Sequence, residues 1–79
     1  MKQELFDLKS EMLTLDIAPQ YYGIDELPFD EGFCIYDARS VIEVFYYERG
    51  QKLRLKTFTE VQQAICYFKE QLASMFDNI

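Results

Sequence analysis

The segment from Gly32 to Glu60 constrains the fold more than any other part of the chain. It is dense in β-branched, aromatic and aliphatic residues, and two short interruptions divide it into three runs. Runs of this kind predict short antiparallel strands joined by tight turns. The expected strands span residues 32–37, 40–48 and 51–57. Gly50 supplies the positive φ that the second turn needs, so the second hairpin is the better defined of the two.

The two turns also set a register, which sorts the side chains onto two faces of the sheet. A turn at residues 38–39 pairs Phe33 with Val44, and a turn at residues 49–50 pairs Val44 with Leu55. One face is then almost wholly apolar and is the expected core side, with Phe33, Ile35, Ile42, Val44, Tyr46, Leu53 and Leu55. The outer face mixes aromatic and charged residues, namely Cys34, Tyr36, Val41, Glu43, Phe45, Tyr47, Lys52, Arg54 and Lys56. On it the register pairs Glu43 with Lys56 and places Phe45 opposite Arg54, a cross-strand cation–π pair.

Helical periodicity flanks the strands on both sides. Residues 2–16 place apolar side chains on one stripe, and residues 59–76 do the same over a wider stripe. The second helix has two candidate capping boxes, which begin at Thr57 or at Thr59. The sequence therefore predicts a single α+β domain over residues 1–79, of order α-β-β-β-α. In this domain two helices pack on one face of a three-stranded antiparallel meander.

Residues 17–31 read as a long acidic loop between the first helix and the sheet. Two prolines and a glycine interrupt regular structure there, and the segment contains no Lys or Arg. It also contains several large apolar side chains, so we expect it to pack against the body of the protein. Its acidic residues, Asp25, Glu26, Asp30 and Glu31, are candidates for binding a basic surface, with a merely solvated loop as the alternative.

Charge and residue types exclude several functions. A net charge of −6 disfavours nucleic-acid binding and favours a basic protein partner or simple solubility. The chain has no histidine, and Cys34 and Cys66 are far apart, so we expect reduced thiols and neither a metal site nor a cofactor. No glycine-rich phosphate loop is present. The adjacent acids at 25–26 and 30–31 are more typical of a solvated turn than of a catalytic carboxylate pair, which argues against an enzyme. The absence of a long apolar run predicts a cytoplasmic protein with no membrane segment.

The outer sheet face is the second candidate binding surface. If uncovered, it exposes more aromatic area than a monomer normally leaves in water, next to an arginine. The expected contact residues on this face are Tyr36, Phe45, Tyr47 and Arg54. Two other arrangements remain open, because the acidic loop could fold over this face or a homodimer could cover it.

Part of the chain resembles small bacterial immunity proteins of polymorphic-toxin systems. The matching features are a strand with Cys34, an aromatic strand end at 45–47, the turn at 48–50 and a helix with Ala64 and Tyr67-Phe68. The preceding segment 21–24 fits the same pattern. The resemblance implies a cytosolic protein that binds a cognate toxin domain and blocks it without catalysis, and the acidic charge suits a basic target such as a nuclease. An acidic inhibitor of a nucleic-acid-binding protein, encoded by a phage or a host, and a small structural or regulatory homodimer are the alternatives.

Overall fold

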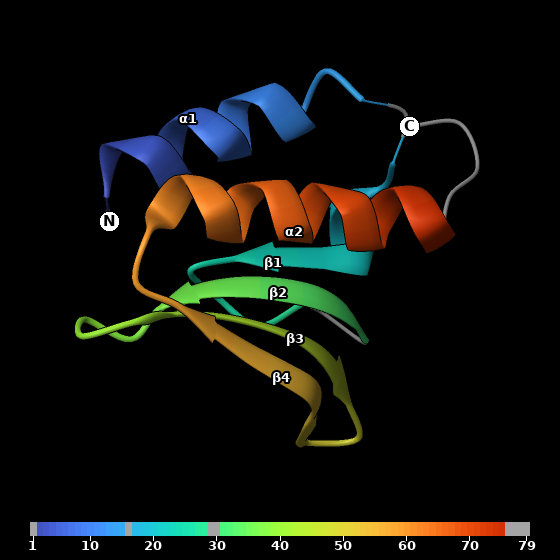
Figure 1. Ribbon diagram of the computed structural model, residues 1–79. Coiled ribbons are helices and arrows are strands. Elements are labelled where there is room, and N and C mark those ends of the chain that lie inside the picture. Colours follow the sequence, from blue (N-terminus) through green and yellow to red (C-terminus); the bar gives the residue numbers. More distant parts are fainter. Residues whose placement is uncertain (1, 16, 29–30, 76–79) are drawn as a thin grey trace.

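The protein has two helices on one side of a four-stranded sheet, as Figure 1 shows. The computed structural model describes residues 2–15, 17–28 and 31–75. In chain order the elements are α1 (Gln3–Met12), the 3-10 helix η1 (Pro19–Tyr21), β1 (Tyr22–Ile24), β2 (Gly32–Asp37), β3 (Ile42–Glu48), β4 (Gln51–Phe58) and α2 (Val61–Met75). The helix α2 contacts β2, β3 and β4, whereas α1 contacts α2 and β1. The predicted α+β class is confirmed.

The sheet has one strand more than the sequence predicted. Its order is β1-β2-β3-β4, and β1 runs parallel to β2 while the other pairs are antiparallel. The strand β1 lies within residues 17–31, so the prediction of an uninterrupted loop there is wrong. All three residues of β1 are buried, and so short a run shows no alternation of polar and apolar residues that would mark it as a strand.

The chain that follows β1 turns over the face of the sheet that the helices leave uncovered (Figure 1), where Leu27 lines a hollow with Tyr36 and Phe45. Parallel strands are normally joined by a dozen or more residues, usually including a helix. Here only residues 25–31 separate the two strands, and the described part of this connection, residues 25–28, turns back directly over the sheet. A Cβ atom on Gly23 would collide with the backbone of Glu26 and touch that of Pro28. Glycine at this position is what allows the connection to lie so close to β1.

The first hairpin is shifted by two residues from the predicted register. Phe33 pairs with Tyr46 and Ile35 with Val44, so the strand predicted to begin at residue 40 begins at Ile42. An Asp37 carboxylate oxygen accepts a hydrogen bond from the backbone N–H of Arg39 at 2.9 Å, and this side-chain bond helps to close a wider loop than a two-residue turn. A shift of two residues preserves the faces, so the predicted core side of β2 and β3 is correct.

The second hairpin follows the predicted register only as far as Leu53, which pairs with Tyr46. Beyond it Lys56 pairs with Val44, so Arg54 and Leu55 together lie opposite Phe45 and form a β-bulge. The predicted pairs of Val44 with Leu55 and of Glu43 with Lys56 are therefore wrong. The bulge reverses the faces beyond Leu53, so Lys56 lies on the helix side of the sheet. Its ammonium is 4.7 Å from the ring centre of Tyr67.

The core lies between the sheet and the two helices. Its buried side chains come from α1, α2 and the first three strands, including Leu5, Leu8, Met12, Ile24, Phe33, Ile35, Val44, Ala64, Phe68 and Leu72. Leu53 and Leu55, which the sequence placed in this core, are 37% and 50% exposed. Both helices are shorter than predicted, and two predicted helical positions, Asp16 and Phe76, lie outside the described residues.

Candidate partner-binding surfaces

The acidic residues of segment 17–31 do not form one surface cluster. Asp25 is half-buried and has a structural role, since its N–H donates to the Ile35 carbonyl at 2.7 Å. Its carboxylate accepts a hydrogen bond from the backbone N–H of Asp37 at 3.1 Å. These two bonds connect the end of β1 to β2, so the Asp25 carboxylate already has a hydrogen-bond partner within the fold.

The other acids of this segment are dispersed. Glu26 is exposed and lies 3.6 Å from Lys9 of α1, whereas Glu31 accepts a hydrogen bond from the Tyr46 hydroxyl at 3.3 Å. Asp30 lies outside the described residues. Glu26 therefore remains available to a partner, because its ion pair with Lys9 is exposed and weak.

The outer face is partly covered by the chain itself. Phe45 is 1% exposed, so the expectation that it lies open to solvent is wrong. It lies beneath the connection that follows β1 and lines a shallow hollow of about 230 Å³ together with Leu27, Tyr36 and Lys52. Tyr36 is 39% exposed and Tyr47 is half-buried. Of the three open arrangements for this face, folding of the loop over it is the one observed at Phe45.

The cation on this face is a lysine and not the predicted arginine. The Lys52 ammonium lies 4.9 Å from the ring centre of Phe45 and 2.9 Å from a Glu43 carboxylate oxygen. The predicted contact between Phe45 and Arg54 is not formed, because the bulge interrupts the alternation of side chains between the two faces of β4 and turns Arg54 away from Phe45. Arg54 instead has a positive φ of 56°.

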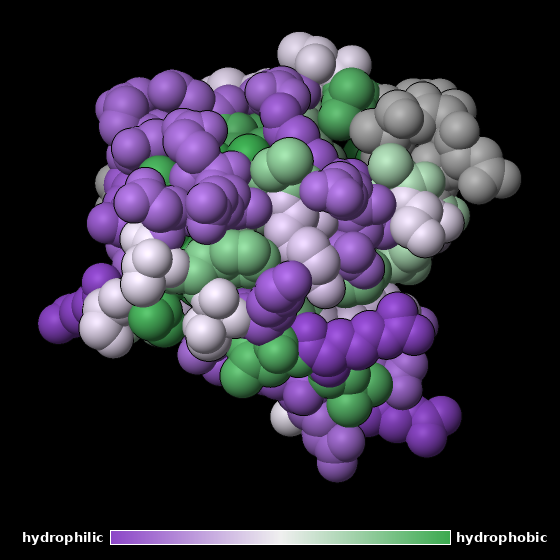
Figure 2. Space-filling view, in the orientation of Figure 1, coloured by the Kyte–Doolittle hydropathy of each residue, from purple (hydrophilic) through white to green (hydrophobic). Residues whose placement is uncertain are grey.

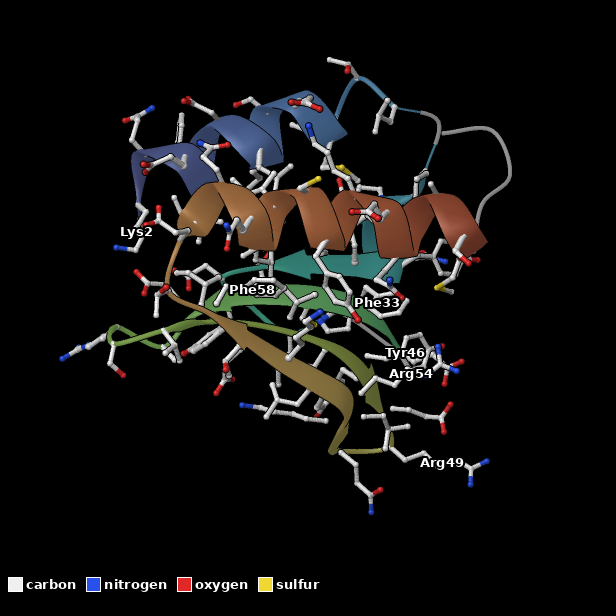
Figure 3. All side chains as sticks on the ribbon, viewed as in Figure 1. Lys2, Phe33, Tyr46, Arg49, Arg54 and Phe58 are labelled. Carbon is white, nitrogen blue, oxygen red and sulfur yellow. The ribbon has the colours of Figure 1, made fainter. Side chains whose placement is uncertain are left out.

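Arg54 lines a different hollow, at the open end of the sheet below the last turn of α2. Figure 3 shows Arg54 next to Tyr46 and Phe33, with Arg49 pointing away from them. The hollow has a volume of about 310 Å³ and is lined by Phe33, Tyr46, Glu48, Leu53, Arg54 and Met75. Burial and the nearby Glu31 carboxylate raise the pKa of Tyr46, and the positive charge of Arg54 acts in the opposite direction. A mostly apolar hollow with one guanidinium at its rim suits a partner's side chain better than it suits catalysis.

Charge is distributed unevenly over the molecule. Residues 1–31 contain eight acids and two bases, whereas residues 32–79 contain six of each, so the first segment accounts for the whole net charge. The first segment forms α1 and β1 at one edge of the sheet, and β4 lies at the other edge with Lys52, Arg54 and Lys56. Figure 2 shows hydrophobic side chains over β4 in patches among hydrophilic ones. Sequence reasoning noted these cations but assigned them to one outer face, because it did not anticipate the bulge.

The two cysteines have different surroundings. Cys34 is buried, and burial raises the pKa of its thiol to about 12, with a small opposing effect from Lys52. Cys66 is exposed on α2 and donates to a Glu70 carboxylate oxygen at 3.5 Å. Within residues 2–15, 17–28 and 31–75, no group of three or more acidic or cysteine side chains is placed to hold a metal ion. No helix in the described part of the chain is long and apolar enough to cross a membrane.

No protein-family model, curated protein or solved structure matches this chain.

Proposed function

We propose that this protein is a non-catalytic inhibitor of the immunity type, which binds a cognate bacterial toxin domain with a basic surface. The observation that carries the proposal is the concentration of the net negative charge in residues 1–31. That segment supplies α1, which has no contact with β4 among the described residues. Opposite charge on a partner raises the association rate and fixes the orientation of approach.

The acids of α1 are better placed for this role than those that the sequence singled out. Glu4, Asp7 and Glu11 are exposed and line one shallow groove between α1 and α2. Glu11 is paired with Lys69, whereas Glu4 and Asp7 have no ion pair with a described residue. Glu26 adds an exposed carboxylate next to α1. Together these residues give the edge around α1 its negative character.

A binding role also agrees with the chemistry of the chain. The sequence contains no histidine, so the imidazole base used by most serine and cysteine nucleophiles is not available. Asp25 and Glu31 bind other groups of the protein itself. We therefore infer that the protein acts by occupying its target, with Tyr36 and Tyr47 as further candidate contacts on the sheet.

The test needs a candidate toxin domain, and the genes next to this one are the first place to look for it. The two proteins are purified separately, and inhibition is measured as a function of the molar ratio at low and at high salt. The proposal expects stoichiometric inhibition, with an affinity that falls as salt rises because the charges are screened. Absence of inhibition at any ratio would contradict it.

Two double variants with the same net charge as each other test which surface binds the toxin domain. Glu4→Lys with Asp7→Lys reverses the charge of α1, and Glu48→Lys with Glu70→Lys makes the same change in charge elsewhere. The first is expected to weaken binding by roughly tenfold more than the second, a difference of about 1.4 kcal/mol. Equal losses would mean that only the total charge matters, and α1 would then not be the contact.

A further inference from the structure

The strand β4 is an edge strand that the rest of the protein leaves open. It pairs with β3 on one side, and no strand in the described part of the chain pairs with its other side. Every residue from Gln51 to Thr57 is exposed. An open edge presents unpaired backbone N–H and C=O groups, which is the template that strand addition by a partner uses.

The positive charge along β4 favours an acidic partner segment over a basic one. Residues 49–59 contain four cations and no acid. Lys52 is paired with Glu43, and Lys56 lies over the ring of Tyr67. The Arg54 guanidinium has neither an ion pair nor a side-chain hydrogen bond to any residue that the structure describes.

The backbone at Arg54 has a strained conformation, and this conformation determines where its guanidinium lies. Its φ of 56° is in the left-handed region, which disfavours every residue with a Cβ atom. Bulges with their first residue in this conformation usually have glycine there. Arginine at this position directs a cation to the rim of the hollow, which is otherwise lined by four apolar or aromatic residues and by one acid, namely Phe33, Tyr46, Leu53, Met75 and Glu48. Strain at a single residue of an exposed strand is the kind of outlier that marks functional sites.

We propose that β4 binds an extended segment of a partner protein in which acidic and apolar residues alternate. The segment adds to the sheet as a fifth strand next to β4, one of its carboxylates binds the Arg54 guanidinium, and an apolar side chain covers Leu53 and the hollow. A second copy of this chain is a poor occupant, because pairing β4 with β4 sets like charges against each other. This surface is separate from the acidic edge around α1, so the inference does not depend on the proposed function.

The first experiment is a titration of the isotope-labelled protein followed by NMR. The probe is a short capped peptide in which glutamate and valine alternate, and the control peptide has lysine in place of each glutamate. We expect the glutamate peptide to shift the amide signals of Gln51–Phe58 and to slow amide hydrogen exchange there, while the lysine peptide does neither. The proposal is overturned if both peptides bind equally, if the shifts lie elsewhere, or if no shift occurs.

Two glycine variants separate the guanidinium from the backbone effect. Arg54→Gly and Arg49→Gly each remove one cation from a residue with positive φ, 56° and 51° respectively, and only the first borders the hollow. Both variants are expected to fold, with an unchanged or raised melting temperature. Arg54→Gly should weaken binding of the glutamate peptide by about tenfold or more, as loss of a charged hydrogen bond does. Arg49→Gly should preserve the affinity.

The same variants also test the alternatives. Equal loss of affinity in both would reduce the effect to total charge and overturn the role of Arg54. If the β4 signals of the protein alone change on dilution, a second copy occupies the edge and the proposal is wrong. Arg54→Lys retains the charge without the planar fork of donors, and an affinity between those of wild type and Arg54→Gly is expected.

Discussion

The two edges of the sheet differ in how they are protected. The edge strand β1 is short, wholly buried and in contact with α1 and η1. The opposite edge strand β4 is long and exposed, with cations along it and a bulge in its middle. Both are recognised ways to prevent uncontrolled pairing, since an edge can be covered by other elements or made unattractive by charge and distortion. This small sheet is protected by covering elements at β1 and by charge and a bulge at β4.

The difference has a consequence for stability and for function. Around β1 and the connection after it, several side chains and glycines are packed so closely that substitutions at these buried positions must disturb the fold. Along β4 the side chains contact solvent, so substitutions there are free to change binding without changing folding. The protein thus separates a structural edge from an adaptable one, and each prediction below tests this separation.

The largest expected effect is at Phe45, beneath the connection that follows β1. Phe45→Ala removes a buried aromatic side chain and should lower the free energy of unfolding by about 3–5 kcal/mol. The matched variant Leu55→Ala on β4 removes a side chain that is 50% exposed, and it should cost less than about 1 kcal/mol. Urea unfolding followed by circular dichroism measures both. A Phe45→Ala protein as stable as wild type would mean that the connection does not cover the sheet.

The next effect concerns two glycines, Gly32 beside the segment that precedes β1 and Gly50 in the turn before β4. A Cβ atom on Gly32 would collide with the carbonyl oxygen of Tyr21, whereas one on Gly50 would meet nothing within 4 Å. Gly32→Ala should cost about 1–3 kcal/mol through overpacking against backbone. Gly50→Ala should cost about 1 kcal/mol, because its φ of +77° disfavours alanine.

Asparagine distinguishes the two causes. It tolerates the left-handed conformation, so Gly50→Asn should recover much of the stability that Gly50→Ala loses. Gly32→Asn should be no better than Gly32→Ala, since the obstacle there is the Tyr21 backbone. Thermal unfolding of the four variants provides the measurement. Recovery at both positions would show that the edge around β1 is less tightly packed than the structure indicates.

The covered edge is also where sequence reasoning was weakest. The helices, the core faces of β2 and β3 and the turn at Arg49–Gly50 were predicted, because each has a periodic pattern or a turn residue of known conformation. The strand β1 could not be predicted in this way. It is a parallel strand of three residues, and its position depends on pairing with β2, which follows in the chain only after residues 25–31.

The open edge shows a different limit. The bulge at Arg54 depends on a positive φ at an arginine, and no residue type in β4 signals it. One extra residue then exchanged the faces of Leu55 and Lys56 and separated Arg54 from Phe45. The residue types of the candidate site could therefore be listed from the sequence, but not their grouping, because a single inserted residue reverses every face beyond it.

A smaller effect is expected at Asp25, which distinguishes a structural acid from an exposed one. Asp25→Ala removes the acceptor of the Asp37 N–H bond and should cost about 1 kcal/mol. The neighbouring substitution Glu26→Ala removes an exposed ion pair with Lys9 and should cost about 0.5 kcal/mol or less. Chemical unfolding of the two variants measures the difference. Equal stabilities would return Asp25 to the list of residues free to bind a partner.

The last effect is absent at neutral pH and appears in alkaline solution as a change in the slope of stability against pH. Burial raises the pKa of Cys34 from its ordinary 9.0 to about 12, so the folded state favours the protonated thiol. The contribution is complete below about pH 9 and is lost as the pH rises toward about 12, because only the unfolded chain then releases the proton readily.

The thiol can be separated from the tyrosines that titrate in the same range. Burial also raises the pKa of Tyr22 and Tyr46, so wild type and Cys34→Ala should both lose stability above pH 9, with the shallower slope in the variant. A thiol reagent at neutral pH provides an independent check. It should modify the exposed Cys66 at once and Cys34 only as fast as the protein unfolds. Rapid modification of both thiols in the folded protein would show that the cover over Cys34 and Phe45 opens freely, and the contrast between the two edges would then fail.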